Sequence, residues 1–277
     1  MIYVYLILSA VLVPISDIFF DVLREPYSWW LVPVLIIAFF LGFVIIHAAV
    51  LGISVWLVDL EKPQERFSRY FRVLITQSIK MIVSLVGVQI HTTGKENVPE
   101  EGRVMLVCNH LHEIDPAVLI HELPDLELGF IAKKEAYETM PFVARAMHKL
   151  HCLPIDRENN REGAKTIVAA IKKLRDDTVS MGVFPEGHCS EDGELHELRN
   201  GVFKMAQKAE VPIVVCVIAH TKTFVSRLFK KPIHIYLDIL ETIPAEKVAE
   251  MSTAEIGDYV YSVMAKAIEY RKANKKY

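Results

Sequence analysis

The sequence predicts an α/β domain with a mostly parallel central sheet flanked by helices, preceded by an N-terminal membrane-embedded helical region. First, residues 29–58 form a long apolar run that contains no Lys, Arg, Asp or Glu. Second, short apolar segments alternate with segments of helical periodicity from residue 88 onward, which is typical of parallel sheets. Third, polar motifs lie at the ends of several apolar segments, and ligands of open α/β sheets bind beyond the carboxyl ends of strands.

The apolar run 29–58 is the first predicted element. A spanning helix needs about 20 apolar residues, so this run is long enough to cross a bilayer even when tilted. Residues 2–16 are also apolar and predict a second, shorter segment that spans the bilayer or lies in one leaflet. The start of the chain has no basic segment of the kind that precedes a cleaved signal peptide. We therefore expect residues 1–62 to form membrane helices with one or two spans.

Residues 63–87 predict an amphipathic helix next, because apolar side chains recur there at steps of three and four. Two interpretations stay open: an interfacial helix with its apolar face in lipid, or a helix packed on the following domain. Basic residues are concentrated after the apolar run 29–58, whereas Arg24 alone lies between the two apolar runs. By the positive-inside rule, we expect a cell-membrane protein whose large domain faces the cytoplasm. These basic residues are Lys62, Arg66, Arg69, Arg72 and Lys80.

Residues 88–277 predict the α/β domain, and about 190 residues suffice for one sizeable core. The net charge of -3 provides no basic footprint for nucleic acid, so no nucleic-acid partner is expected. The four cysteines are widely spaced, which argues against a zinc ribbon and favours reduced thiols. Predicted strands are 88–94, 103–110, 126–134, 180–187, 211–219 and 233–241, and predicted helices are 161–176, 200–210 and 253–276.

The candidate catalytic pair is His110 and Asp115, five positions apart directly after the predicted strand 103–110. A neutral imidazole can take a proton from a hydroxyl near pH 7, and a carboxylate can orient it and stabilise the imidazolium. Taken alone, the spacing is also met by many surface histidines.

Three further motifs follow in order: LPIDR at 153–157, FPEGHCS at 184–190 and VPIV at 211–214. Together with the motif at 109–116, they resemble the glycerolipid acyltransferase family, whose bacterial members include 1-acyl-glycerol-3-phosphate acyltransferases. The resemblance covers about residues 88–240. It implies acyl transfer from acyl-CoA or acyl carrier protein to the free hydroxyl of a lysophospholipid, most simply 1-acyl-glycerol-3-phosphate, to give phosphatidic acid. The expected partners are membrane lipids, this acceptor and the thioester donor.

The resemblance also implies roles for individual residues. His110 would be the general base and Asp115 would orient it, so that the hydroxyl attacks the thioester directly without an acyl-enzyme. Arg157, Glu186 and Gly187 would help to hold the acceptor and its phosphate. Pro212 would shape the acyl or carrier side, or would simply begin a strand. Lys133 and Lys134 would add positive charge for the phosphate or the carrier.

The third motif departs from the family, which commonly has Thr and Arg where this chain has His188 and Cys189. One phosphate donor is therefore missing, and Arg199 or Lys204 is a candidate replacement. The departure leaves open an acceptor with another headgroup, or a non-catalytic membrane lipid-binding protein.

We expect neither cofactor nor metal, although a metal-dependent hydrolase is a rival interpretation. Its candidate ligands would be His110, His112, Asp115, His121, His188 and His220.

Overall fold

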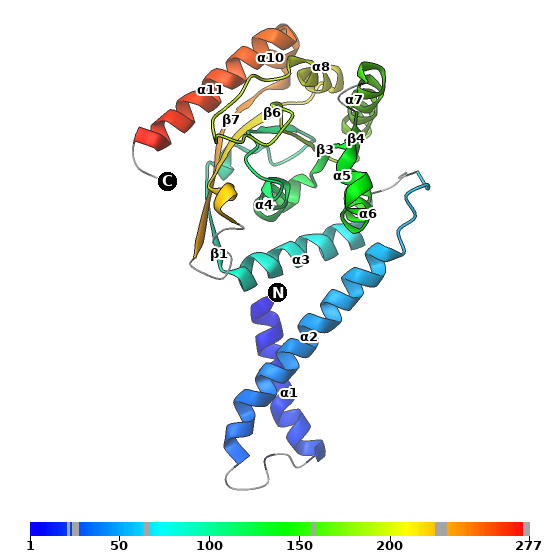
Figure 1. The fold of residues 1–277 in the computed structure, drawn as a ribbon, viewed down its shortest axis with the longest axis vertical. Helices are drawn as coiled ribbons and strands as arrows, with labels where there is room; N and C mark the ends of the chain where they lie inside the picture. Colours follow the sequence, from blue (N-terminus) through cyan, green and yellow to red (C-terminus); the bar gives the residue numbers. More distant parts are fainter. Residues whose placement is uncertain (21–22, 24–27, 64–66, 157–158, 225–231, 274–277) are drawn as a thin grey trace.

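The computed structural model describes residues 1–20, 23, 28–63, 67–156, 159–224 and 232–273. Within them, one sheet has the strand order β1-β7-β6-β2-β5-β3-β4, and every neighbouring pair is parallel except β6 with β7 (Figure 1). This confirms the predicted fold class. The strands are β1 (Val88–Thr93), β2 (Met105–Cys108), β3 (Gly129–Lys133), β4 (Leu153–Ile155), β5 (Met181–Val183), β6 (Ile213–Ala219) and β7 (Ile233–Ile243).

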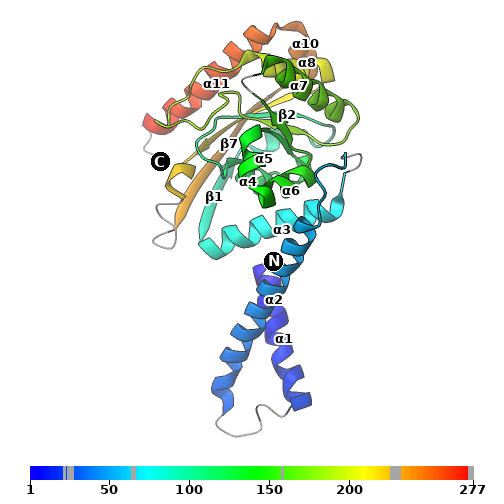
Figure 2. The same ribbon diagram turned by 45° about the vertical axis from the view of Figure 1, so that its right-hand side comes forward.

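Helices cover both faces of this sheet (Figures 1 and 2). One face is covered by α7 (Asn160–Arg175), α8 (Lys204–Ala209), α10 (Ala245–Glu250) and α11 (Thr253–Ala273). The other is covered by α3 (Arg69–Val86), α4 (Asp115–Glu122) and α6 (Pro141–Lys149). The remaining α5 is Lys134–Thr139, and short 3-10 turns are η1 (Ser28–Trp30), η2 (Lys95–Asn97), η3 (Pro124–Leu126), η4 (Asn200–Phe203) and η5 (Thr221–Thr223).

The core lies in two layers because side chains alternate across each strand. In β2, Met105 and Val107 join the layer under α7 and α11, whereas Leu106 and Cys108 join the layer over α3 and α4. All four are fully buried. A strand buried on both faces reads as a continuous apolar run, which explains why this segment is apolar throughout.

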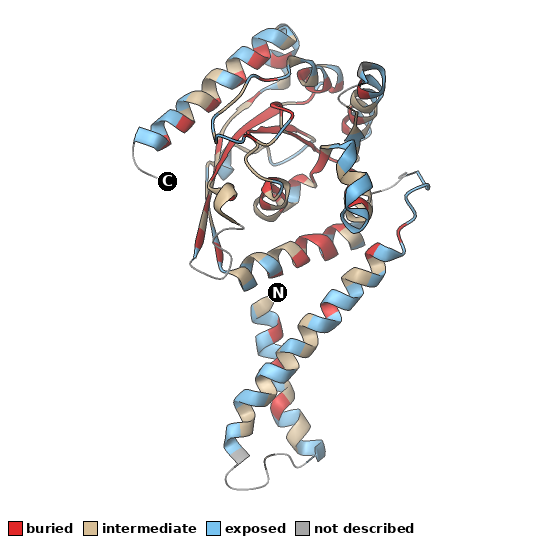
Figure 3. Cartoon of the chain, viewed as in Figure 1, coloured by how far each residue is buried: buried red, intermediate tan, exposed pale blue. Residues whose placement is uncertain are grey.

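The N-terminal segments form two helices, α1 (Ile2–Phe20) and α2 (Leu31–Trp56), that extend away from the sheet as a hairpin (Figure 1). Both are long and apolar enough to cross a membrane, and only 17% and 6% of their apolar windows are buried. Most of their surface is exposed (Figure 3), so they are not core helices of the α/β domain. The structure thus agrees with membrane-embedded N-terminal helices.

A chain of polar contacts connects the hairpin to α3. The Tyr5 hydroxyl lies 2.9 Å from Nδ1 of His47, and Nε2 of His47 lies 2.8 Å from Oγ of Ser78. The three side chains come from α1, α2 and α3 and are buried. Hydrogen bonds between helices can stabilise packing inside a bilayer, so these contacts help to hold the hairpin against the domain.

Helix α3 packs on the α/β domain, as one of the two interpretations left open for it expects, and its contact with lipid stays a prediction. Ile75 is buried and joins the core beneath the sheet, whereas Val73, Ile82 and Leu85 are about half exposed. Arg72, one of the basic residues of this helix, does not lie at the protein surface. It is buried, and its guanidinium donates to the Leu128 carbonyl at 2.9 Å. The boundaries 1–62, 63–87 and 88–277 stay predictions.

The fourth motif lies at a different edge of the sheet from the first. Pro212 precedes β6, and its carbonyl accepts from the N–H of Met105 at 3.0 Å, at the beginning of β2. His110 follows the end of β2, so the length of the strand separates the two residues. Of the two interpretations left open for Pro212, the structure shows the beginning of a strand, away from the edge of the sheet where His110 lies.

Gly94 allows a stability prediction. It has φ +75°, and a Cβ there would lie 2.0 Å from the Ile239 carbonyl oxygen, whereas Gly102, at φ +81°, has open space. Gly102→Ala is expected to lower the free energy of unfolding by about 1–2 kcal/mol through its backbone conformation alone. Gly94→Ala adds a clash and is expected to cost about 3 kcal/mol or more. Denaturant unfolding in detergent measures both, and equal losses would contradict the clash.

Candidate active site

Asn109 sets the position of the predicted base. It follows β2 and is buried, and its side-chain amide bonds both backbone groups of Ile218 on β6. The two distances are 3.0 Å from Nδ2 to the Ile218 carbonyl and 2.7 Å from the Ile218 N–H to Oδ1. The side chain thereby continues the β2–β6 pairing after the strand has ended. His110 consequently leaves the sheet from a fixed point at its carboxyl edge.

His110 and Asp115 lie in contact, with Nδ1 2.9 Å from Oδ2. The same carboxylate oxygen accepts the N–H groups of Leu111 at 2.7 Å and His112 at 2.9 Å. Asp115 is fully buried and is the first residue of α4, where the helix dipole favours a carboxylate. Because Oδ2 of Asp115 already accepts two backbone N–H groups, it is also the acceptor in its contact with His110. Nδ1 of His110 therefore carries its proton and donates it in this hydrogen bond. The Nε2 lone pair of neutral His110 is then directed away from Asp115.

The charge state of His110 follows from its neighbours. Burial by itself lowers the pKa of this imidazole, but the hydrogen bonds with Asp115 and Cys189 outweigh burial and raise the pKa to about 9. The imidazolium therefore predominates at neutral pH in the unliganded protein. Only the molecules in which His110 is neutral can accept a proton, and their fraction grows as the pH rises toward 9.

Glu186 connects the third motif to the first. It is buried, its Oε1 accepts the N–H of His110 at 2.8 Å, and its Oε2 accepts the N–H of His196 at 2.9 Å. Burial raises its pKa, although these two backbone hydrogen bonds lower it in part. Both carboxylate oxygens of Glu186 thus accept hydrogen bonds from backbone N–H groups. The role in holding the acceptor stays a prediction, whereas the contact that positions His110 is present.

Gly187 and Arg199 pack against each other. Gly187 has φ +79°, and a Cβ there would lie 2.7 Å from Nε of Arg199. Glycine therefore lets the arginine side chain lie directly on this turn. Arg199 is exposed and lines two adjoining pockets. The predicted replacement for the missing arginine thus lies beside the third motif.

Lys133 and Lys134 lie at the carboxyl end of β3 and are more than half exposed. Lys133 is 3.9 Å from Glu135, and Lys134 is 4.0 Å from Asp156, which lines an apolar pocket. They lie on the same edge of the sheet as His110. Arg157 lies outside the described residues.

Two side chains outside the predicted set contact His110. The ring of Phe184 stacks on the imidazole with centroids 4.1 Å apart, and Sγ of Cys189 lies 3.2 Å from Nε2. Both belong to the third motif, and Ser190 in the same motif donates its N–H to the His110 carbonyl at 2.7 Å. Their position in a motif beside the histidine was the available signal, since proximity in space is not visible in the sequence.

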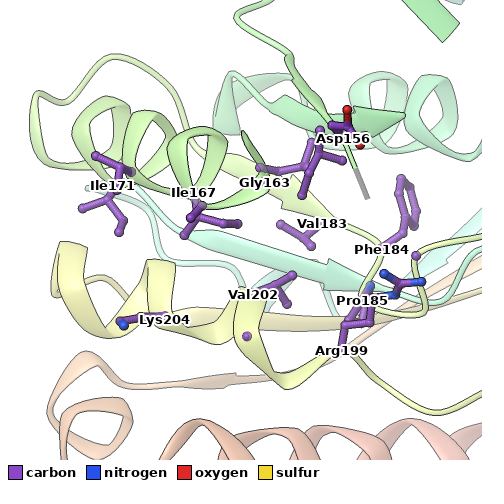
Figure 4. Close-up of a pocket in the computed structure, with 16 residues that line it drawn as sticks. Asp156, Gly163, Ile167, Ile171, Val183, Phe184, Pro185, Arg199, Val202 and Lys204 are labelled. Carbon is purple, nitrogen blue, oxygen red and sulfur yellow. The ribbon is translucent and has the colours of Figure 1, made fainter. Parts of the chain in front are cut away.

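An apolar pocket of about 440 Å³ begins at Phe184 and extends between α7 and the segment 199–204. In Figure 4, Ile167 and Ile171 of α7 lie toward one end, and Phe184 and Arg199 lie toward the other. A volume of this size and an apolar lining are typical of sites for small organic ligands. Phe184, whose ring stacks on His110, thus lies between the imidazole and the other residues of the pocket lining.

The candidate ligands of the rival metal site do not lie close enough together to bind one metal ion. Among the described residues, no three His, Cys, Asp or Glu side chains are placed to hold a metal ion. His112 accepts the N–H of Ile114 at 3.3 Å, and His121 contacts Glu122 at 2.6 Å. The expected absence of a metal requirement stays a prediction.

Comparisons with known proteins find relatives that are named as acyltransferases. A protein of Borreliella burgdorferi named 1-acyl-sn-glycerol-3-phosphate acyltransferase is 26% identical over 199 residues, which cover 71% of this chain and 78% of the relative. A Mycoplasma pneumoniae protein named as a probable enzyme of that kind is 33% identical over 55% of each chain. A Bacillus subtilis protein named 1-acyl-sn-glycerol-3-phosphate acyltransferase is 30% identical over 50% of this chain and 65% of its own.

The fold also has a solved counterpart. The crystal structure of the 1-acyl-sn-glycerophosphate (LPA) acyltransferase PlsC from Thermotoga maritima superposes with a TM-score of 0.63 at 22% identity, over 82% of this chain and 89% of that one. At this identity the match supports the fold alone. The Acyltransferase family model matches residues 89–219, which include His110, Asp115 and the third motif. Residues 89–219 of this chain thus carry an Acyltransferase domain, as expected of an O-acyltransferase.

Proposed function

We propose that this acyltransferase moves a fatty acyl chain from acyl-CoA or acyl carrier protein to the free hydroxyl of lysophosphatidic acid, giving phosphatidic acid for phospholipid synthesis. His110 takes the hydroxyl proton, and Asp115 holds the imidazole and stabilises its charge. The observation that carries the proposal is the 2.9 Å contact of Nδ1 of His110 with a buried carboxylate. The His110 ring also stacks on Phe184, which lines an apolar pocket. A thioester carbonyl is electrophilic enough for this reaction without a cofactor.

The apolar pocket is the proposed place for the donor's acyl chain. Its walls are mostly aliphatic, and burying each CH₂ group contributes about 0.8 kcal/mol. A chain that extends from Phe184 toward Ile171 has its carboxyl end next to His110. The end of the pocket at Ile167 and Ile171 then limits the length of the bound chain.

Ile167→Trp is expected to shorten this pocket. With palmitoyl thioester as the donor, kcat/KM falls about tenfold relative to octanoyl thioester, because about two buried CH₂ groups lose their contacts. Ile167→Ala is the matched control: it enlarges the same place and leaves long donors accepted. Initial rates with the two donors measure the ratio. An unchanged ratio in Ile167→Trp would place the acyl chain elsewhere.

The acceptor phosphate is proposed to lie near Arg199. A polar pocket of about 600 Å³ next to the third motif is lined by Arg199, His188 and His196, together with Glu186 and Glu197. Guanidinium groups bind phosphate through paired hydrogen bonds, and the exposed Lys133 and Lys134 add positive charge at this edge. The names of the curated relatives support the same acceptor.

A panel of lysolipids with one labelled acyl thioester tests the acceptor. We expect lysophosphatidic acid to be preferred over lysophosphatidylcholine, lysophosphatidylethanolamine and monoacylglycerol. Arg199→Ala is expected to raise its KM about tenfold, since a charged hydrogen bond contributes about 1.5 kcal/mol or more. Arg175→Ala, at the exposed end of α7, is the control. A clear preference for the acceptor without phosphate would end the proposal for lysophosphatidic acid.

We also infer that the hairpin anchors the protein in the cell membrane with the α/β domain on the cytoplasmic side. Lys62, Arg69 and Lys80 follow α2 and support this orientation by the positive-inside rule. The hairpin brings the N-terminus back toward the domain, as expected of two crossings (Figure 1). Digestion of the domain by protease added to intact cells without an outer membrane would contradict it.

A further inference from the structure

Helix α7 carries a row of positive charge on its outer surface. Arg161, Lys165 and Lys172 follow one another at steps of four and seven residues, so they lie on one side of the helix, and all three are exposed. At about 1.5 Å of helix per residue, the row extends over roughly 16 Å. Glu162, the one acidic residue of α7, pairs only with Lys165, at 2.7 Å. The helix therefore presents an extended basic surface to solvent.

An apolar centre interrupts this row. Val168 lies between Lys165 and Lys172, and its side chain is 65% exposed, more than any other large apolar side chain described from residue 88 onward. Ala164, one turn earlier, is exposed as well, and both residues line the apolar pocket. An apolar centre inside a charged rim is typical of surfaces that bind another protein.

The opposite wall of the pocket continues the positive charge. Helix α8 packs beside α7 and carries Lys204 and Lys208 four positions apart, both exposed. Lys204 lines the pocket across from Ile171 of α7 (Figure 4). Four cations on the two helices form no ion pair with another described residue: Arg161, Lys172, Lys204 and Lys208. We refer to these four, with Lys165, Ala164 and Val168, as the basic surface.

The place of the basic surface in the fold argues against a lipid partner. Helices α7 and α8 lie at the end of the domain away from the hairpin of α1 and α2, whereas α3 and α6 lie beside the hairpin (Figures 1 and 2). A bilayer around the hairpin thus lies on the other side of the domain. A partner of the basic surface therefore comes from the aqueous phase and carries negative charge.

The pocket indicates what such a partner delivers. The donor's acyl chain is proposed to lie between α7 and the segment 199–204, so the basic surface surrounds the place where that chain binds. Coenzyme A has its charges close together at its nucleotide end. A row of roughly 16 Å on α7, an apolar centre and further cations on α8 fit the wider surface of a protein instead.

We propose that the basic surface is a docking site for an acidic acyl carrier protein, which presents its acyl chain to the adjoining pocket. This inference rests on the proposed function and assigns the donor's carrier a binding surface of its own. Opposite charges speed the encounter of the two proteins and orient them, while Val168 and Ala164 contact an apolar side chain of the partner.

Initial rates with two donors test the docking site in the full-length enzyme in detergent, with lysophosphatidic acid as the acceptor. Lys172→Glu is expected to raise KM for palmitoyl carrier protein about tenfold, because it reverses a charge at the interface. Lys172 does not line the pocket, so KM for palmitoyl-CoA is expected to change less than about twofold. Lys266→Glu, the same change at an exposed lysine of α11, is the matched control and leaves both values unchanged.

A binding measurement separates docking from catalysis. Apo carrier protein, which lacks the prosthetic arm and the acyl chain, is expected to bind the wild type less tightly as salt is added, and to bind Lys172→Glu about tenfold less tightly. Wild type that does not bind apo carrier protein, an unchanged KM in Lys172→Glu, or an equal rise of KM for both donors would each overturn the docking site and leave the proposed function standing. Wild type that binds the carrier protein but acylates no lysolipid from either donor would end the proposed function instead.

Discussion

His110→Ala is expected to lower kcat for acyl transfer by about 10²–10⁴-fold, the range that a positioned general base contributes. Nδ1 of His110 contacts a fully buried carboxylate, and its ring stacks on Phe184, which lines the apolar pocket. The loss is expected with acyl-CoA and with acyl carrier protein as the donor, because His110 takes the proton of the attacking group in both reactions. Initial rates with labelled palmitoyl thioester and lysophosphatidic acid measure it.

His112→Ala is the matched control for this variant. It lies two positions away, and its ring accepts only the N–H of Ile114 at 3.3 Å among the hydrogen bonds of the described residues. We expect it to keep activity within a few-fold. If His112→Ala lost as much as His110→Ala, and chelators also inhibited the enzyme, the metal-dependent interpretation would replace the general base.

Much of the fold was predictable because a strand that is buried on both faces has a continuous run of apolar residues in the sequence. The run 211–219 becomes β6, and the run 103–110 contains β2, since no polar side chain can face either core layer. Helix α7 was equally predictable, because it is longer than four turns and its polar residues are mostly Lys and Arg.

Shorter elements escaped prediction for a physical reason. Helix α4 has eight residues and begins at Asp115, and α5 has six. Helices this short have no intrinsic stability in water and form only because the domain packs around them. The LPIDR motif contains β4 itself, and three residues are too few to display a period.

The contacts of the site were likewise predictable only where they join residues close in the sequence. The distance from His110 to Asp115 follows from five positions of chain that enter a helix, so a local motif sufficed to predict the contact. The contact of His110 with Cys189 joins residues 79 positions apart. It depends on β2 and β5 lying side by side in the sheet, and only the topology establishes that. Burial of Arg72 likewise depends on the carbonyl of Leu128, which approaches from another part of the chain.

Asp115→Asn is expected to cause the second large loss of activity, and the reason is electrostatic. An amide oxygen can still accept from Leu111 and His112, so the turn before α4 is expected to fold. The variant lacks the negative charge that stabilises the imidazolium formed when His110 takes a proton. In addition, Oδ1 of Asp115 is buried with no hydrogen-bond partner among the described residues, and an amide nitrogen in its place would be an unsatisfied donor. We expect kcat to fall by about 10²–10⁴-fold.

The pH dependence distinguishes this explanation from simple misfolding. In the wild type the pKa of His110 is raised to about 9, so kcat/KM is expected to rise with pH and to level off above about 9, where the base is neutral. Without the carboxylate the pKa of His110 falls toward its ordinary value, so the rise in Asp115→Asn is expected at lower pH with a much lower plateau. The exposed Asp125→Asn is the control and keeps both the plateau and the midpoint. A variant that loses activity while its midpoint stays near that of the wild type would show that Asp115 does not act through the charge of His110.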